Sequence, residues 1–286
     1  MITILEVIRR STEHLEQRGT PNPKLDAEWI VAHSLGMGRM DLYLQFERPL
    51  TEDELAPMRP LLRRRGNREP LQYVLGETDF AGLRLTCDCR ALIPRPETER
   101  LFEILTSEQG PEPARILDLG VGSGALALAL ARFHPAAEVV AADASKDALA
   151  LAKENATAHD LAERVRFFQG DWFNAVPLEE KPFELIVSNP PYLTEDEWAE
   201  AELEVRGYEP KGALVAEDAG AAHLLEILAQ APNHLAPGGL LALETGVEHH
   251  PCLNKAADQA GYADIKALPD LSGRPRFFLA RLGAAG

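Results

Sequence analysis

From residue 114 onward, short apolar runs alternate with segments of helical periodicity, and this alternation limits the possible folds more than any other feature of the sequence. The predicted strands cover residues 115–119, 138–142, 165–169, 183–188, 240–244, 262–268 and 276–282. Repeated strand–helix units imply a mostly parallel sheet with helices on both faces. The turn Ser272-Gly273-Arg274-Pro275 joins the last two strands as a hairpin, which adds an antiparallel strand. The predicted fold class is therefore α/β.

The N-terminal part of the chain has a different pattern. Apolar residues recur there at helical spacing, and we predict three helices, over residues 2–17, 23–36 and 51–62. Thr51 and Glu54 have the spacing of a capping box at the start of the third helix. Residues 1–78 are therefore interpreted as a small helical-bundle domain.

A short linker follows this bundle. Residues 83–87 alternate between apolar and polar side chains, and the apolar run 91–93 precedes Pro94, so a β-hairpin is predicted within residues 79–95. The α/β domain then covers residues 96–286. Neither an internal repeat nor a low-complexity linker is evident in the sequence.

The charge balance argues against sequence-blind binding to nucleic acid. The chain has 29 Lys and Arg against 45 Asp and Glu, a formal net charge of -16, whereas such binding depends on cations that neutralise phosphates. The one candidate basic patch comprises Arg59, Arg63, Arg64, Arg65 and Arg68. Two interpretations of it stay open: a solvated helix C-terminus, where cations are favoured, and a surface that docks a partner.

Cysteine usage and hydropathy indicate a cytoplasmic protein. Cys87, Cys89 and Cys252 have neither the number nor the spacing of a disulfide framework or a zinc site, so no metal is predicted. The N-terminus lacks a signal-peptide pattern. The most apolar long stretch, 116–133, is interrupted by Asp118 and glycines, so no membrane association is expected.

A glycine-rich loop follows the strand 115–119. Its residues are Asp118, Leu119, Gly120, Val121, Gly122, Ser123 and Gly124. Glycines allow a tight turn and close approach of a ligand to the backbone, and the helix that follows offers free N–H groups. The spacing is GxGxG rather than the GxGxxG of dinucleotide-binding dehydrogenases. We predict a nucleoside-binding loop, the alternative being a tight turn without a ligand.

Acidic residues end the next two predicted strands. Asp143 can accept both hydroxyls of a ribose, although a helix start at this point would also favour an acidic residue. Asp171 and Trp172 follow the third strand, where a carboxylate beside an aromatic ring could bind the amino group and the face of an adenine. A tryptophan in such a place is also compatible with a purely structural role in the core.

The sharpest motif is the tetrapeptide Asn189-Pro190-Pro191-Tyr192, which ends the strand 183–188. Two prolines cannot continue a central strand, so the chain must leave the sheet at its carboxyl edge, where α/β folds bind ligands. The Asn189 side chain and the Pro190 carbonyl offer acceptors for an NH₂ group, and Tyr192 offers a flat surface. Together with the nucleoside-binding loop, this motif predicts an S-adenosylmethionine-dependent methyltransferase that acts on a planar nitrogen.

The chemistry assigned to the tetrapeptide needs no strong general base. The lone pair of an amide nitrogen is delocalised into its carbonyl group. Acceptors on both N–H bonds would direct that lone pair toward the methyl donor, and positioning would supply most of the acceleration. The catalytic candidates are therefore Asn189, Pro190 and Tyr192. The eight histidines show no spacing typical of a catalytic triad or a metal site.

Over nearly its whole length the chain resembles the HemK-type protein-(glutamine-N5) methyltransferases, which act on peptide chain release factors. The tetrapeptide is shared with other amino-methyltransferases, but its combination with Leu92-Ile93-Pro94-Arg95-Pro96-Glu97-Thr98-Glu99 is typical of this family. The other markers are Pro70-Leu71-Gln72-Tyr73, Phe80-Ala81-Gly82-Leu83, Glu209-Pro210, Pro237-Gly238-Gly239 and Asp270-Leu271-Ser272-Gly273.

This resemblance implies a Rossmann-like class I methyltransferase fold with a seven-stranded sheet, behind a helical domain that helps to hold the protein substrate. It implies S-adenosylmethionine as cofactor, bound by Gly120–Gly124, Asp143, Trp172 and Asn189. The implied substrate is the glutamine of the Gly-Gly-Gln motif of class I release factors, held by Asn189–Tyr192. A monomer is expected, without stable nucleic-acid binding.

Other functions stay open at this point. An exocyclic amine of adenine or guanine would satisfy the same acceptors, but the enzyme would have to flip the base or act on single strands. Glutamine methylation of a ribosomal protein is a second alternative. A nicotinamide-dependent oxidoreductase and a non-catalytic binding module are weaker, because neither explains the tetrapeptide.

Overall fold

The computed structural model describes residues 2–107 and 112–283, which form two compact units. Unit 1 comprises residues 1–77 and 202–208, and unit 2 comprises residues 78–201 and 209–286. The chain thus enters unit 1 twice, the second time through a short helix that lies far along the sequence.

Unit 1 is helical, as its periodicity predicts. Its helices are α1 (Ile4–Gln17), α2 (Pro23–Leu35), α3 (Arg39–Leu44), α4 (Glu52–Leu55), α5 (Met58–Gly66), α6 (Leu71–Leu75) and α11 (Leu203–Tyr208). The capping box is confirmed, since the Thr51 backbone N–H donates to Glu54 and the Glu54 N–H to the Thr51 hydroxyl. The single helix predicted over residues 51–62 is wrong: the segment forms α4 and α5, which separate at Pro57, a residue without the N–H that a helix interior needs.

The basic run of unit 1 is largely engaged in ion pairs. Arg65 is 4% exposed, and it donates to Asp26 over 2.7 Å and to Glu204 over 3.0 Å. Arg68 also pairs with Glu204, at 2.5 Å. Charges removed from water are retained where they are paired in this way. The pairs attach α11 to α5 inside unit 1, so much of the run is structural rather than a free basic surface.

The linker hairpin differs from the predicted one. It pairs β1 (Glu77–Phe80) with β2 (Leu83–Thr86), and residues 91–93 do not form a strand. Ala81 and Gly82, which join the strands, both have positive φ, 49° and 75°. Such a turn matches the twist of a tight hairpin but is unusual for alanine.

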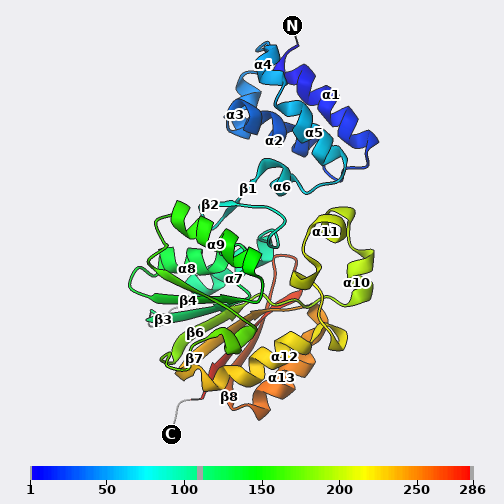
Figure 1. Ribbon diagram of the computed structural model, residues 1–286. Coiled ribbons are helices and arrows are strands. Elements are labelled where there is room, and N and C mark those ends of the chain that lie inside the picture. Colours follow the sequence, from blue (N-terminus) through cyan, green and yellow to red (C-terminus); the bar gives the residue numbers. More distant parts are fainter. Residues whose placement is uncertain (1, 108–111, 284–286) are drawn as a thin grey trace. The chain divides into compact units, whose positions relative to one another are not determined.

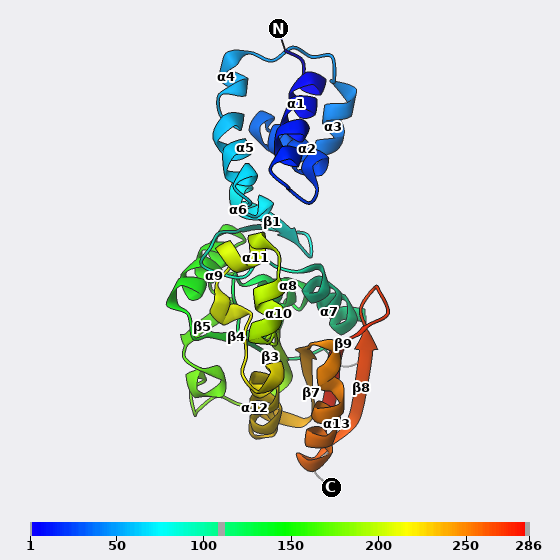
Figure 2. The same ribbon diagram turned by 90° about the vertical axis from the view of Figure 1, so that its right-hand side faces the viewer.

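Unit 2 contains a seven-stranded sheet of order β5-β4-β3-β6-β7-β9-β8. Its strands are β3 (Arg115–Leu119), β4 (Glu138–Asp143), β5 (Val165–Gln169), β6 (Phe183–Ser188), β7 (Leu235–Glu244), β8 (Tyr262–Pro269) and β9 (Pro275–Leu282). The first five are parallel, and β9 runs antiparallel to both of its neighbours, β7 and β8. The predicted fold class is confirmed, and Figure 2 shows the closing hairpin at one edge of the sheet.

Helices cover both faces of this sheet (Figure 1). On one face lie α7 (Pro96–Ser107), α8 (Ala125–Phe133) and α9 (Lys146–Ala158), and on the other α12 (Ala222–Gln230) and α13 (His250–Gln259). The remaining helical elements are α10 (Glu195–Glu200) and the 3-10 turns η1 (Trp172–Ala175), η2 (Lys211–Ala213), η3 (Asp218–Gly220), η4 (Ala231–Asn233) and η5 (Val247–His249).

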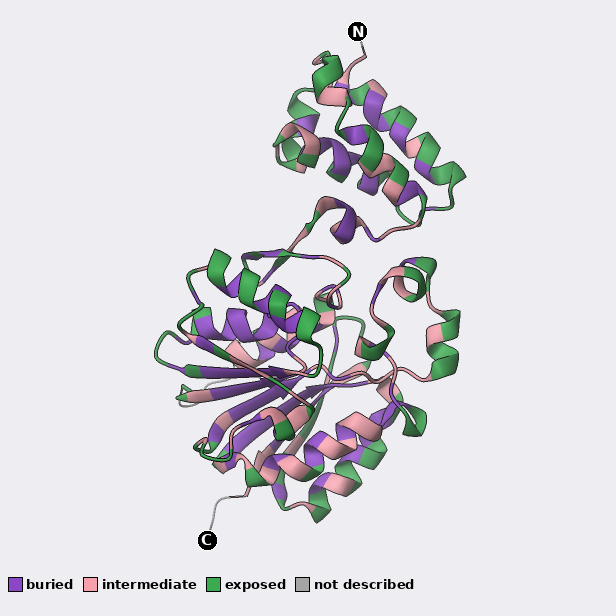
Figure 3. Cartoon of the chain, viewed as in Figure 1, coloured by how far each residue is buried: buried purple, intermediate pink, exposed green. Residues whose placement is uncertain are grey.

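Alternate residues of the strands pack into two separate cores. Ile116 and Leu185 face α7–α9, whereas Leu117 and Ile186 face α12 and α13. Successive side chains of a strand point to opposite faces, so strands buried on both sides must be apolar throughout. Figure 3 shows this burial along the central strands, whereas the edge strand β8 has several exposed residues. No helix in the described part of the chain has the length and apolar character needed to cross a membrane.

Candidate functional site

The site lies at the carboxyl edge of the parallel strands in unit 2. From β3 the chain proceeds through β4 and β5 on one side, and through β6 and β7 on the other. The loops after β3 and β6 therefore diverge, and such a switch point leaves a crevice where open α/β sheets bind ligands. The glycine-rich loop and the Asn-Pro-Pro-Tyr segment follow these two strands.

A cavity of about 590 Å³ opens at this edge. It is lined by most of the predicted site residues, namely Asp118, Gly120, Val121, Gly122, Ser123, Asp143, Asp171, Trp172, Asn189 and Pro191. Its volume is within the range of small-molecule sites. Gly124, Pro190 and Tyr192 are not among the lining residues: Gly124 begins α8, and Tyr192 turns toward the interior.

The first acidic residue of the loop, Asp118, is 2% exposed. Its Oδ2 atom has no hydrogen-bond partner among the described residues. Burial raises the pKa of this carboxyl to about 7, an effect that the Ala127 backbone N–H opposes. A buried, unpaired carboxyl beside a cavity favours a ligand that brings a cation to it.

Glycines allow the loop to pass close to the site. Gly120 has φ +77°, and a Cβ atom there would lie 3.5 Å from the Trp172 ring. Gly124 has φ +89°, and its Cβ would lie 3.1 Å from Leu128 Cδ1. Only glycine adopts such positive φ values without strain. The loop thus exposes backbone, rather than side chains, toward the cavity.

Asp143 stands at the end of β4, beside this loop. Its Oδ2 accepts a hydrogen bond from the Gly122 N–H at 2.9 Å, and its Oδ1 accepts one from the Ser145 N–H at 2.8 Å. Ser145, not Asp143, caps α9, since its hydroxyl accepts from the Ala148 N–H. Burial raises the pKa of Asp143, and the two backbone donors counteract that rise. The carboxylate is thereby held at the cavity wall, with lone pairs left for hydroxyl donors.

Trp172 contributes a flat apolar wall. It lines the cavity, its ring lies against Gly120, and its ring centroid is 5.2 Å from that of His223. Its backbone has φ +44°, a strained value for a residue with a large side chain. The preceding residue, Asp171, is exposed at the mouth of the cavity.

The Asn-Pro-Pro-Tyr segment is held by polar contacts to two other elements. Asn189 Nδ2 donates to the Thr98 hydroxyl at 3.0 Å, and the Tyr192 hydroxyl donates to Glu244 at 3.0 Å. The Arg276 guanidinium lies over the Tyr192 ring, 5.8 Å from its centroid. With Nδ2 committed to Thr98, Oδ1 is the atom of the Asn189 amide that is available to accept a hydrogen bond.

These residues fit S-adenosylmethionine, the cofactor that the resemblance implies. Asp118 offers an unpaired buried carboxyl to a cation, Asp143 offers lone pairs to ribose hydroxyls, and Trp172 offers a face to a purine. Among the described residues, no group of three or more His, Cys, Asp and Glu side chains could hold a metal ion.

The sequence did not reveal several residues of the site. The residues that line the cavity without having been predicted include Arg90, Ala91, Thr98, Ser145, Pro210, Gly212 and His223. The segment 92–99 was identified only as a family marker, although it contributes Leu92–Arg95 and Thr98 to the wall. Glu244 was missed entirely, because a single carboxylate at the end of an apolar strand gives no local signal of its partners.

Comparison with known proteins places this site in a family. Residues 6–76 match the model of the PrmC N-terminal domain, and residues 96–204 match the methyltransferase small domain. A release factor glutamine methyltransferase of Geobacter sulfurreducens is 39% identical over 281 residues, covering 98% of this chain and 97% of that protein. The release factor glutamine methyltransferase of Deinococcus radiodurans is 40% identical, and the alignment covers 96% of this chain and 97% of that protein. That of Escherichia coli K12 is 38% identical, and the alignment covers 92% of this chain and 94% of that protein.

Solved structures support the fold independently. A methyltransferase from Pyrococcus furiosus aligns with a TM-score of 0.53 at 20% identity, over 71% of this chain and 90% of that one. A Thermus thermophilus 16S rRNA N2 G1207 methyltransferase, solved with AdoMet and guanosine, aligns with a TM-score of 0.52 at 22% identity, over 72% of this chain and 49% of that one. Because these relatives are similar over nearly the full length and both domains match, the chain belongs to the release factor glutamine methyltransferase family.

Proposed function

We propose that this protein transfers a methyl group from S-adenosylmethionine to the side-chain amide nitrogen, N5, of the glutamine in the Gly-Gly-Gln motif of class I peptide chain release factors. The observation that supports this most directly is the arrangement of Asn189, whose amide lines the cavity with its acceptor atom uncommitted. An acceptor at this point suits a substrate nitrogen that carries two hydrogens.

The residues of this chain promote the reaction by orienting the side-chain amide of the substrate glutamine. Hydrogen bonds from the substrate NH₂ to Asn189 Oδ1 and to the Pro190 carbonyl hold the nitrogen in one plane and one direction. Rigid positioning of reacting groups can supply several kcal/mol of the barrier, about 7–11 in the best cases. Tyr192, anchored on Glu244, keeps the tetrapeptide from shifting.

S-adenosylmethionine, when bound, supplies an electrophilic methyl group on a sulfonium. In this proposal Asp118 balances its positive charge, Asp143 binds the ribose hydroxyls, and Asp171 and Trp172 bind the adenine. Gly120, Val121, Gly122, Ser123 and Gly124 supply backbone contacts, and Asn189 lies between cofactor and substrate. The methylated nitrogen releases its proton to solvent, so no dedicated base is required.

Unit 1 is proposed to dock the protein substrate. It carries exposed apolar side chains on neighbouring helices, among them Trp29 of α2 and Met40 and Leu44 of α3, which are 39%, 67% and 85% exposed. We propose that these side chains contribute to a surface that contacts the release factor. We further propose that the protein acts as a monomer in the cytoplasm, where release factors function, and forms no stable complex with nucleic acid.

The decisive experiment offers three classes of substrate in parallel. The protein is incubated with labelled S-adenosylmethionine and a class I release factor, total RNA or duplex DNA. Label is expected on the release factor. It should disappear when the glutamine of the Gly-Gly-Gln motif is replaced. Label only in nucleic acid would overturn the proposal. The net charge of -16 already disfavours that outcome.

Substitution of Asn189 tests its role. Asn189→Ala is expected to retain cofactor affinity within about tenfold while kcat falls by roughly a hundredfold or more, because the lost contact acts mainly in the transition state. Calorimetric titration and steady-state kinetics measure the two effects separately. Parallel losses in both would mean that Asn189 is chiefly a cofactor-binding residue.

A further inference from the structure

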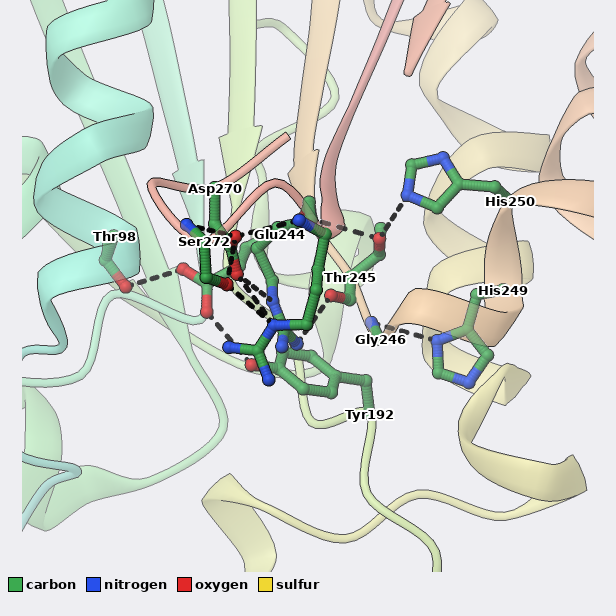
Figure 4. A network of polar contacts seen from close by, with 11 residues as sticks. Thr98, Tyr192, Glu244, Thr245, Gly246, His249, His250, Asp270 and Ser272 are labelled. Carbon is green, nitrogen blue, oxygen red and sulfur yellow. Dashed lines mark hydrogen bonds and ion pairs between the residues drawn. The ribbon is translucent and has the colours of Figure 1, made fainter. Parts of the chain in front are cut away.

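A buried carboxylate connects the substrate-binding segment to the rest of unit 2. Glu244, at the end of β7, is fully buried, with 0% exposure. Its Oε2 accepts a hydrogen bond from the Thr98 hydroxyl at 2.6 Å, and its Oε1 accepts one from the Tyr192 hydroxyl at 3.0 Å. Figure 4 shows Glu244 between these two side chains, which come from α7 and from the segment after β6.

The hydrogen-bond directions in this network follow from the acceptor character of Glu244. An ionised carboxylate only accepts, so both hydroxyls must donate to it. A threonine hydroxyl has one hydrogen, which Thr98 uses on Glu244. Its oxygen can then only accept from the third member, Asn189, and the atom that donates at 3.0 Å is Nδ2.

The consequence concerns which end of the Asn189 amide is presented to the cavity. An amide side chain has a donor end and an acceptor end of nearly the same shape, and only its hydrogen bonds decide between the two orientations. Because Thr98 binds Nδ2, Oδ1 is left as the acceptor. Without that partner, both orientations would be accessible.

We propose that Glu244 and Thr98 are positioning residues that fix the acceptor end of Asn189, and that they thereby make the site select a glutamine side chain over a glutamate. The proposal rests on the function proposed above, in which Asn189 receives the substrate amide. A glutamine presents N–H donors to Oδ1, whereas a glutamate presents an oxygen that repels it. A flipped Asn189 would present Nδ2 and would favour the glutamate.

Two hydrogen-bond donors and a cation near Glu244 favour its ionised form. Burial raises the pKa of Glu244, but the Thr98 and Tyr192 hydroxyls and the Arg276 guanidinium act in the opposite direction. The Glu97 carboxylate adds to the rise. Arg276 is itself held in place through its hydrogen bond to the Thr245 carbonyl, at 3.0 Å.

The test compares a release factor with its variant that has glutamate in place of the Gly-Gly-Gln glutamine. Their dissociation constants are measured by calorimetry in the presence of S-adenosylhomocysteine, for the unmodified protein, Thr98→Val and Thr98→Ser. Valine has nearly the shape of threonine but lacks the hydroxyl, and serine restores it. A ratio of affinities is used because a general loss of stability would weaken both complexes alike.

The unmodified protein is expected to prefer glutamine by a factor of a hundred or more, because a site built to hydrogen-bond a substrate group rejects an analogue that leaves its own polar group unpaired. Thr98→Val should reduce this preference at least tenfold, whereas Thr98→Ser should keep it within about threefold. An unchanged preference in Thr98→Val, or an equal loss in both variants, would overturn the proposal.

A second variant keeps the test decisive if Thr98→Val does not fold, as judged by circular dichroism and thermal unfolding. The amide of Glu244→Gln can either accept from or donate to the Thr98 hydroxyl, so this variant permits both orientations of Asn189. It should also lower the preference for glutamine over glutamate at least tenfold, and an unchanged preference would overturn the proposal. A different result distinguishes failure of the proposed function: the unmodified protein would then transfer no methyl group to the glutamine form at all.

Discussion

The buried side chain of Asn155 in α9 offers a quantitative test of how the glycine-rich loop is supported. Asn155 is 0% exposed, and its Oδ1 accepts from the Thr86 N–H at 2.7 Å. Its Nδ2 donates to the Thr86 carbonyl at 3.1 Å and to the Ser123 carbonyl at 2.9 Å. One side chain therefore links strand β2 to the loop that lines the cavity.

Replacement by alanine removes all three hydrogen bonds. Each contributes roughly 0.5–1.5 kcal/mol net, and a backbone group left unpaired in a dry site costs about 1–3 kcal/mol. Water that enters the vacated space would recover part of that cost, so we expect a loss of about 3 kcal/mol. For a domain of this size, 1 kcal/mol corresponds to roughly 2–4 °C, which gives a drop in Tm of about 6–12 °C.

Differential scanning calorimetry of the cofactor-free protein measures this change, and titration with S-adenosylmethionine measures the affinity. The affinity should also fall several-fold, because the Ser123 carbonyl loses its anchor. Thr157→Ala is the matched control, since Thr157 is an exposed residue of the same helix whose hydroxyl donates to the Lys153 carbonyl. Its effect should stay within about 0.5 kcal/mol. A Tm drop in Asn155→Ala no larger than in this control would refute the argument.

Three further predictions concern the pH response, the tetrapeptide and docking. Burial raises the pKa of Asp118 to about 7 from its ordinary value of 3.8, so this carboxyl makes the cofactor-free protein lose stability as the pH rises from about 4 to 7. Asp118→Asn lacks this loss, and the difference in Tm between the variant and the unmodified protein should therefore increase over that range. A difference that stays constant would contradict the argument. A Cβ at Gly220 would overlap the Tyr192 carbonyl, so Gly220→Ala should displace the tetrapeptide and lower kcat at least tenfold in steady-state assays. The control Gly207→Ala, which meets no atom within 4 Å of its Cβ outside its own helix, should leave kcat unchanged. Met40→Glu with Leu44→Glu should lower kcat/KM for a full release factor at least tenfold but leave a short Gly-Gly-Gln peptide unaffected, and equal effects on both would contradict docking on unit 1.

The sequence predicted those parts of the molecule whose signals are local. A run such as residues 183–188 must be a buried strand, and the two prolines that follow must end it at the carboxyl edge. Parallel strands bring all their carboxyl ends to one edge, so the separate motifs at Asp118, Asp143 and Asn189 had to meet. Periodicity and turn chemistry therefore sufficed for the fold class and for the part of the cavity wall that these motifs form.

The wrong and missing predictions share a different cause. Strand β1 is short and polar, and its turn places Ala81 at φ 49°, a conformation that alanine does not indicate in a sequence. Helix α11 packs in unit 1 because Glu204 meets Arg65 and Arg68, which precede it by 139 and 136 residues. Ion pairs formed across such separations have no local pattern from which they could be inferred.

The same reasoning applies to the chemistry of the site. An Asn-Pro-Pro-Tyr segment offers acceptors to any planar NH₂ group, and nothing within the four residues decides how the Asn189 amide is turned. That decision depends on Thr98, and through it on Glu244, which lies 146 residues from Thr98 along the chain. In the proposal above, the Glu244 carboxylate thus sets the direction of two successive hydrogen bonds and the polarity of the surface that meets the substrate. The motif supplies the functional group, but the fold decides which of its two ends is used.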